Sequence, residues 1–191
     1  MNLLAIFLKA FLIDNIVLLQ FIALCPFIGM STDEEKSVGM GLAVTFVTVL
    51  ATCVTWPIYK FIFIPLDLVF LQILAFILVI ASLVQLVEFF LKKMVPGLYS
   101  AMGIYLALIT TNCGILAVTF NAIDFDYNLL QSIVYAIGVA LGFLLAMLLL
   151  AGIRHRLRIS PVPAFLKGTP ALFAATTLLS IAFMGFKGLV Q

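Results

Sequence analysis

Six long apolar stretches, separated by short polar segments, dominate the hydropathy pattern of this chain. They run over about residues 5–29, 38–59, 68–91, 98–120, 129–152 and 169–188. An α-helix needs about 20 apolar residues to cross a hydrocarbon layer about 30 Å thick. The pattern therefore predicts an all-α, polytopic membrane protein with six transmembrane helices.

The composition supports this interpretation, because 65% of the 191 residues are hydrophobic and only 9% are charged. A soluble domain of this size needs far more polar surface. The longest segment between the stretches, about residues 153–168, is too short to fold alone. We therefore expect a single integral membrane domain over 1–191, embedded in the lipid bilayer. We expect no nucleic-acid partner, and any nucleotide would be bound by another subunit.

Positive charges are concentrated in alternate loops. The loops after the first, third and fifth stretches carry Lys36, Lys92, Lys93, Arg154, Arg156, Arg158 and Lys167. The opposite side has Lys9, Lys60 and Lys187, together with Asp67, Asp124 and Asp126. Because cytoplasmic loops are enriched in Lys and Arg, the first set is predicted to be cytoplasmic. A multi-pass protein of the inner, cytoplasmic membrane with both termini outside follows from this assignment.

The six predicted helices divide into two groups of three, about residues 1–95 and 96–191. The first helix of each group carries a cysteine followed by a helix breaker, and the second is long and follows a polar loop. Three crossings bring the chain to the other side, so the second group must enter the membrane from the opposite face. This predicts a 3+3 inverted repeat, with broken first and fourth helices, about an axis in the membrane plane.

Cys25 and Cys113 occupy matching places in the two groups, 88 residues apart. Pro26 follows the first and Gly114 follows the second. Pro lacks the N–H that a helix interior needs and Gly weakens a helix, so both sites predict interrupted transmembrane helices. Irregular backbone at membrane depth has to be buried in protein or line a cavity, so we expect both cysteines to face inward. Cys53 has no counterpart at the same offset, and we interpret it as a packing residue.

Three roles are open to the pair of cysteines: a disulfide, a structural metal site, or ligands of a redox cluster. A disulfide is disfavoured at the membrane midplane, which oxidising enzymes do not reach. Zinc requires four ligands, and the only histidine, His155, lies in a basic loop. An iron–sulfur cluster also takes four protein ligands, so this role would require two from another subunit.

Other polar residues within the apolar stretches are candidates for an ion path. Asp14 and Glu88 are intramembrane carboxylates, a class that often has a function. Asp14 lies eleven residues before Cys25, about 16 Å along a helix and so near the outer interface. Glu88 can pair with Lys92 one turn later, so a structural role is the simpler interpretation of both carboxylates. Further polar groups could satisfy backbone freed at the breaks or line a path, namely Asn15, Gln20, Gln85, Thr110, Thr111 and Asn112.

Five segments of the chain resemble a known family, the RnfA proteins of the Rnf electron-transport complex. They are residues 24–29 (LCPFIG), 39–43 (GMGLA), 74–80 (LAFILVI), 108–113 (LITTNC) and 183–186 (FMGF). The likeness covers essentially the whole chain. A sister family is NqrE of the sodium-translocating NADH:quinone reductase, and the Cys-Pro-Phe run favours the Rnf side.

The resemblance implies a six-helix subunit paired with a homologous membrane subunit of opposite topology, similar to RnfE. The pair together would hold a 2Fe-2S cluster, for which Cys25 and Cys113 are the ligands from this chain. Such complexes, which also contain proteins similar to RnfB, RnfC, RnfD and RnfG, carry flavins on other subunits. They move electrons between ferredoxin and NAD and couple this to translocation of Na⁺ or H⁺.

The sequence therefore predicts an electron-relay subunit of an ion-translocating oxidoreductase, without a complete active site of its own. Two other classes of function remain open. A non-redox transporter subunit is one, because inverted repeats with broken helices are also a transporter design. A purely structural membrane subunit is the other.

Overall fold

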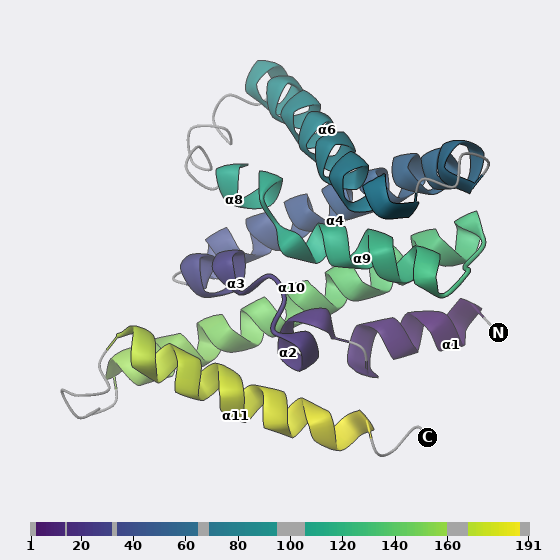
Figure 1. The fold of residues 1–191 in the computed structure, drawn as a ribbon. Coiled ribbons are helices and arrows are strands. Elements are labelled where there is room, and N and C mark those ends of the chain that lie inside the picture. Colours follow the sequence, from purple (N-terminus) through teal and green to yellow (C-terminus); the bar gives the residue numbers. More distant parts are fainter. Residues whose placement is uncertain are drawn as a thin grey trace.

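The computed structural model describes residues 3–13, 15–31, 34–64, 69–94, 106–159 and 168–187. Every regular element in these ranges is helical, as the hydropathy pattern predicts. In an apolar surrounding the backbone has to satisfy its own hydrogen bonds, which a helix does within one segment. Figure 1 shows that successive helices run back and forth between the same two ends of the molecule.

The helices follow the apolar stretches closely. The first stretch contains α1 (Leu3–Leu8), the π-helical turn η1 (Lys9–Ile13), α2 (Ile16–Gln20) and α3 (Leu24–Met30). The second and third contain α4 (Glu34–Ile58), the π-helical turn η2 (Tyr59–Phe63), the 3-10 turn η3 (Val69–Leu71) and α6 (Gln72–Met94). The last three contain α8 (Leu106–Thr110), α9 (Cys113–Asp124), α10 (Leu129–Ile159) and α11 (Thr169–Lys187).

Three helical segments of the described chain are long and apolar enough to cross a membrane by themselves. They are Ser37–Phe63, Gln72–Phe89 and Leu129–Leu157. Two shorter apolar helices cover Leu108–Asp124 and Thr169–Gly185. The first stretch contains no long helix, because its path is interrupted twice and continues as α1, α2 and α3.

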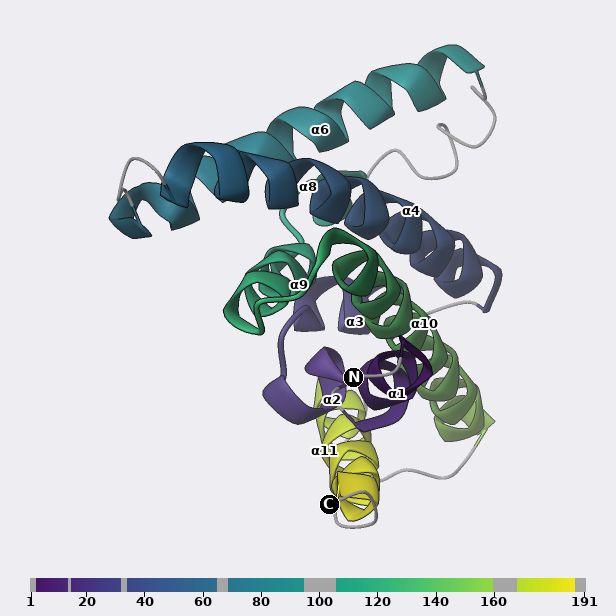
Figure 2. The same ribbon diagram turned by 90° about the vertical axis from the view of Figure 1, so that its right-hand side faces the viewer.

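The long helices α4 and α10 form the centre of the molecule. They pack against each other more extensively than any other pair of described helices, and Figures 1 and 2 show the other helices arranged around them. The buried side chains of α4 recur at helical spacing, at Met40, Val44, Val47 and Ala51. They meet Phe143, Met147 and Leu150 of α10 in the main hydrophobic core.

The buried polar side chains of α4 are satisfied within the helix. The hydroxyls of Thr48, Thr52 and Thr55 donate to carbonyl oxygens four residues earlier, at 2.6, 2.8 and 2.7 Å. Thr48 lies in the central contact, where an unpaired hydroxyl would be costly. These threonines therefore let α4 stay in an apolar core.

Two glycines allow the first segment to approach α10 closely. A Cβ placed on Gly138 would lie 2.9 Å from the Ala10 Cβ and 3.1 Å from the Phe7 carbonyl oxygen. A Cβ on Gly142 would lie 2.9 Å from the Phe11 carbonyl oxygen. The spacing of four puts both glycines on one face of α10, which is how small residues bring membrane helices together.

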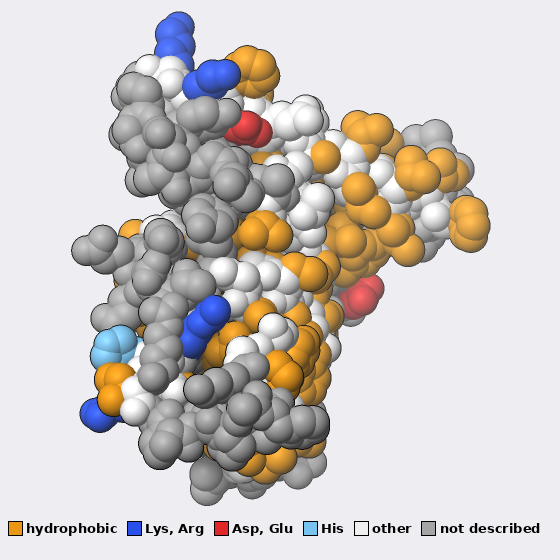
Figure 3. All heavy atoms as spheres, turned by 90° about the vertical axis from the view of Figure 1, so that its left-hand side faces the viewer, with side chains coloured by type: hydrophobic (Ala, Val, Ile, Leu, Met, Phe, Trp, Pro, Cys, Tyr) orange, Lys and Arg blue, Asp and Glu red, His pale blue; other side chains and the backbone are white. Residues whose placement is uncertain are grey.

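The charged side chains separate toward opposite ends of the molecule. Lys92 and Lys93 end α6, and Arg154 and Arg156 lie in the last turns of α10, at the left-hand end in Figure 1. Figure 3 faces this end and shows its Lys, Arg and His side chains. The turn after α9, which follows Asp124, lies at the other end, as do the start of α1 and the end of α11. Two charged residues used in the topology prediction, Asp67 and Lys167, lie outside the described residues.

Candidate functional site

The helical path is interrupted immediately before each of the two matched cysteines. Between α2 and α3 the chain passes through Phe21 and Ala23, both in the left-handed region with φ of 54° and 65°. Between α8 and α9 it passes through Thr111 and Asn112. Cys25 is the second residue of α3, and Cys113 is the first residue of α9.

The predicted position of the breaks is therefore wrong by a few residues, although interruptions do occur in both segments. Pro26 and Gly114 follow the cysteines, but they lie inside the first turns of α3 and α9. The first N–H groups of a helix have no partner within it, so a proline there removes no hydrogen bond. Pro26 consequently begins a helix instead of ending one.

Two buried asparagines cap α2 and α9, which restart after an interruption, whereas α3 begins after Ala23 without a side-chain cap. The Asn15 side-chain oxygen accepts from the N–H groups of Val17 and Leu18 at 3.2 and 3.4 Å at the start of α2. The Asn112 oxygen accepts from the Gly114 N–H at 2.9 Å at the start of α9. Both asparagines thus satisfy backbone groups freed at a break, one of the two roles that the sequence suggested for them.

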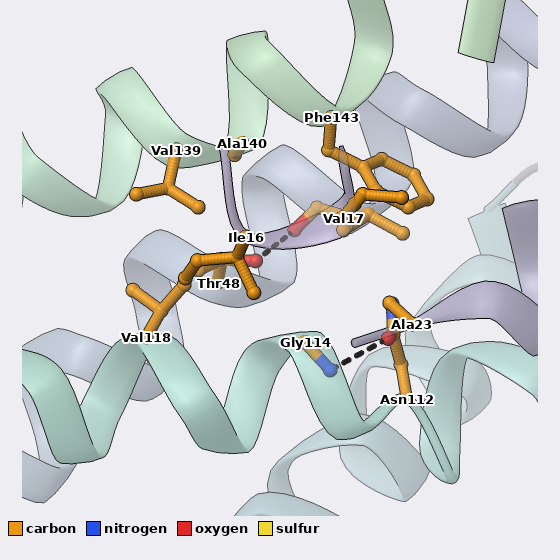
Figure 4. Close-up of a pocket in the computed structure, with 11 residues that line it drawn as sticks. Ile16, Val17, Ala23, Thr48, Asn112, Gly114, Val118, Val139, Ala140 and Phe143 are labelled. Carbon is orange, nitrogen blue, oxygen red and sulfur yellow. Dashed lines mark hydrogen bonds between the residues drawn. The ribbon is translucent and has the colours of Figure 1, made fainter. Parts of the chain in front are cut away.

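The two asparagines differ in their amide nitrogens. Asn15 Nδ2 donates to the carbonyl oxygen of Gly142 on α10 at 2.9 Å. Asn112 Nδ2 is buried and has no hydrogen-bond partner among the described residues. A small cavity of about 20 Å³ lies beside it, between the two breaks and the α4–α10 core. Figure 4 shows Asn112 at the edge of this cavity.

The two breaks touch each other. The backbone N–H of Ala23, in the first break, donates to Cys113 Sγ at 3.1 Å. A Cβ on Gly114 would lie 3.0 Å from the Ala23 Cβ, so the missing side chain at Gly114 permits this approach. Figure 4 shows Ala23, Asn112 and Gly114 side by side. Residues 90 positions apart in the sequence are thereby joined in one site.

Both cysteines of this site lie at the surface of the chain. Cys25 and Cys113 are exposed, so the expectation that they face inward is wrong for the chain by itself. Their neighbours Ala23 and Ile115 are the residues that face the main hydrophobic core. Cys53 is partly buried in the middle of α4, away from both breaks in the sequence.

Further hydrogen bonds attach α2 to α11 and α3 to α10, and the sequence does not predict them. The Ser180 hydroxyl of α11 donates to the Leu18 carbonyl oxygen at 2.5 Å, which satisfies an acceptor near the end of α2. Arg154 of α10 donates to the Ile28 carbonyl oxygen at 3.2 Å and to Ser31 Oγ at 3.3 Å at the end of α3. A cation there is favourable because carbonyl groups are unpaired at a helix C-terminus.

The remaining ion-path candidates do not gather at the cysteines. Asp14 lies outside the described residues. Glu88 is partly buried on α6, on the same face as the exposed Lys92 one turn later. Thr110 is the last residue of α8 and adjoins the second break. No group of three or more His, Cys, Asp or Glu side chains suited to a metal ion occurs in the described part of the chain.

Comparison with known proteins decides the family. Residues 3–190 match the family described as "Rnf-Nqr subunit, membrane protein". The chain belongs to this Rnf-Nqr family. The match spans nearly the whole sequence, including both cysteine segments, and it confirms the membrane-protein assignment.

Individual members of the Rnf-Nqr family resemble the chain over almost their full length. It is 50% identical to the A subunit of the "Ion-translocating oxidoreductase complex" of Syntrophotalea carbinolica, over 99% of this chain and 98% of the relative. It is 49% identical to the A subunit of the "Na(+)-translocating ferredoxin:NAD(+) oxidoreductase complex" of Acetobacterium woodii, with the same coverage. It is 48% identical to the corresponding protein of Serratia proteamaculans, over 98% of this chain and 97% of the relative.

Proposed function

We propose that this chain is the membrane electron-relay subunit of an ion-translocating ferredoxin:NAD oxidoreductase complex. Within it, Cys25 and Cys113 supply two ligands of a 2Fe-2S cluster whose other ligands come from a homologous subunit. The names of relatives about 50% identical to this chain support the assignment to such a complex. They also favour the RnfA type over the sister protein of the sodium-translocating NADH:quinone reductase.

One observation carries the ligand assignment. Each of the two cysteines lies in the first turn of a helix that restarts after an interruption, and the two interruptions are in direct contact. A packing cysteine needs no such arrangement, and Cys53, in the uninterrupted part of α4, has none. Contact between the breaks favours a shared role for Cys25 and Cys113.

The residues present fit half of a 2Fe-2S site. Such clusters are held by four protein ligands, usually cysteine thiolates. Both thiols are exposed on one chain, and the described residues offer no third soft ligand beside them. Two exposed thiols suit a site completed across a subunit interface. A bound cluster would supply a one-electron carrier within the membrane.

The chain's own groups position and stabilise these ligands. Asn112 caps α9 and fixes where Cys113 begins the helix. The N-terminus of α9 carries partial positive charge, which is favourable beside the negatively charged sulfur of a cluster ligand. Arg154 attaches α3 to α10 and Ser180 attaches α2 to α11, so the segment bearing Cys25 is held in place on both sides.

The contacts between helices support the 3+3 inverted repeat. The first segment, α1 with η1, packs on α10, while α9 packs on α4. In the same way α11 contacts α2, while α6 contacts α8. Each contact between the two groups of helices thus has a counterpart with the groups exchanged, as a two-fold axis between α4 and α10 would produce.

The remaining parts of the proposal follow from this assignment. The partners are a homologous membrane subunit of opposite topology and further proteins similar to RnfB, RnfC, RnfD and RnfG, some of which carry flavins. The complex lies in the cytoplasmic membrane with both termini of this chain outside, and it translocates Na⁺ or H⁺. Asp14, Asn15, Glu88, Thr110 and Asn112 are the residues of this chain proposed to line an ion path.

Among these residues, Asn112 has the strongest structural support for a place on the path. Its buried amide nitrogen lacks a partner among the described residues, and Asn112 lines a small cavity whose other lining residues are mostly apolar. Asn15 has its amide occupied by Gly142 and its oxygen by two N–H groups. This full use of its hydrogen-bonding groups favours capping as its main role.

A spectroscopic experiment separates this function from a transporter or a purely structural role. The chain is co-purified with its homologous membrane partner and reduced with dithionite, and the EPR spectrum and the iron content are measured. We expect a 2Fe-2S signal and two irons for each pair of subunits. An assembled pair without iron would contradict the redox function and favour one of the other two classes.

A further inference from the structure

Ala23 has a backbone conformation that its side chain disfavours. It lies in the left-handed region with φ of 65° and ψ of 32°, and only 1% of its surface is exposed. Residues with a Cβ rarely adopt this conformation, which glycine adopts freely. Strained backbone of this kind persists where the surrounding structure fixes it, and it is concentrated at functional sites.

Hydrogen bonds fix Ala23 on both sides. Its carbonyl oxygen accepts from the Phe27 N–H at 3.3 Å, at the start of α3. Its own N–H points away from the first segment and donates to Cys113 Sγ at 3.1 Å. The preceding N–H, of Ile22, donates to the Ile16 carbonyl oxygen at 3.4 Å. The left-handed turn therefore directs one particular N–H to the sulfur at the second break.

We propose that Ala23 is a positioning residue of the redox centre, whose backbone N–H raises the reduction potential by donating to the Cys113 sulfur. The inference rests on the proposed function, because it requires Cys113 to be a cluster ligand. When one electron arrives from a ferredoxin-type donor, the negative charge at the ligand sulfurs increases. A hydrogen bond to a more negative acceptor is stronger, so the Ala23 N–H stabilises the reduced form more than the oxidised form. No proton is transferred in this step.

Gly114 sets the distance over which this hydrogen bond acts. An added Cβ at Gly114 would lie 3.0 Å from the Ala23 Cβ and 3.1 Å from Asn112 Oδ1. The contact with Ala23 is tighter than an ordinary van der Waals distance and joins the two breaks, so the breaks would have to separate. Separation lengthens the bond between the Ala23 N–H and Cys113 Sγ without removing either group.

The test uses redox titration of the EPR signal in the purified complex. Gly114→Ala should lower the equilibrium constant of reduction about tenfold, which for one electron is a shift of about 59 mV to lower potential. Adding Ala23→Gly in the double variant removes the Cβ that the new side chain meets, and it should restore most of the potential. Gly29→Ala is the control, because a Cβ at this position of α3 meets no atom of the described residues within 4 Å, and it should leave the potential unchanged.

A second measurement tests the hydrogen bond without disturbing the packing. In complex labelled with ¹⁵N-alanine and grown otherwise on ¹⁴N, pulsed EPR of the reduced state should detect a coupling to ¹⁵N. Ala23→Ser, labelled in the same way, keeps the backbone N–H but replaces the labelled nitrogen, so this coupling should disappear. This experiment does not use Gly114→Ala, so it tests the hydrogen bond even if that variant fails to assemble.

The outcomes distinguish this inference from the proposed function. A 2Fe-2S signal with an unchanged potential in Gly114→Ala, or a ¹⁵N coupling unaffected by Ala23→Ser, would overturn the role of Ala23 and leave the ligand assignment intact. Absence of iron from the wild-type complex would overturn the proposed function itself.

Discussion

The two capping asparagines make different numbers of hydrogen bonds at the starts of α2 and α9. Asn15 uses its oxygen to cap α2 and its nitrogen to attach the break to α10 at Gly142. Asn112 caps α9 with its oxygen, while its buried nitrogen has no partner among the described residues. The start of α2 is therefore tied to α10, whereas the start of α9 has a donor without a partner among the described residues.

This difference predicts unequal losses of stability. Asn15→Ala removes a cap and a buried hydrogen bond, and should cost about 2–4 kcal/mol. Asn112→Ala removes one cap bond only and should cost about 1 kcal/mol. The detergent-solubilised complex, with a tag on this chain, is heated and then run on gel filtration. The measurement is the temperature at which the tagged chain dissociates from the complex. Equal losses for the two variants would show that the contact with Gly142 contributes nothing.

Among single residues, sequence reasoning finds polar side chains and misses backbone roles. Asn15 and Asn112 stand out because they are amides within apolar stretches, and backbone capping was one of the two roles expected for them. Ala23 gives no signal, since nothing in its side chain indicates a left-handed conformation or a hydrogen bond to a sulfur 90 residues away. Its role depends on contacts that exist only in the folded chain.

Among the helices, the apolar stretches predict the elements well and the breaks less well. The long helices α4, α6 and α10 follow from runs of more than 20 apolar residues. The breaks were expected after the cysteines, because Pro and Gly disfavour a helix interior. Pro26 instead lies in the first turn of α3, and the break before α2 has no proline or glycine beside it to indicate it.

The packing of α1 and η1 on α10 gives a prediction about glycine. Gly142→Ala introduces a Cβ that would lie 2.9 Å from the Phe11 carbonyl oxygen. Backbone cannot easily yield there, so we expect a loss of about 1–3 kcal/mol, as for other overpacked sites. The loss of stability is measured as before, by the temperature at which this chain dissociates from the heated complex on gel filtration.

Gly152→Ala is a matched control in the same helix. A Cβ on Gly152 meets no atom within 4 Å in the part of the chain that the structure describes, so the variant should be neutral or gain up to about 1 kcal/mol from higher helix propensity. If both glycine variants behaved alike, the close contact of the first segment with α10 would be refuted.

For the molecule as a whole, the separation of charge predicts the orientation in the membrane. The basic ends of α6 and α10 lie at one end, and the start of α1 and the end of α11 lie at the other. A reporter that is active only in the cytoplasm should be active when it is fused after Lys92 or Arg156. The same reporter should be inactive when it is fused to the C-terminus. A cytoplasmic C-terminus would contradict either the number of crossings or the orientation.

The complete fold also shows what a single sequence cannot give. Hydropathy identifies a membrane protein, the cysteine spacing predicts two related halves, and the motifs indicate the family. They do not reveal that Cys25 and Cys113 are exposed on the chain, because exposure depends on how the breaks lie against the core. Two exposed cysteines, with no third soft ligand beside them in the described residues, are what the proposed cluster would need a partner chain to complete.

The most direct test of the ligand assignment replaces each cysteine with serine in the assembled complex. Serine keeps the approximate volume but binds iron poorly in place of a thiolate. Cys25→Ser and Cys113→Ser should each lose the 2Fe-2S EPR signal and its iron while the subunits still assemble, and Cys53→Ser should retain both. A full cluster signal in either of the first two variants, or its selective loss in Cys53→Ser, would contradict the assignment.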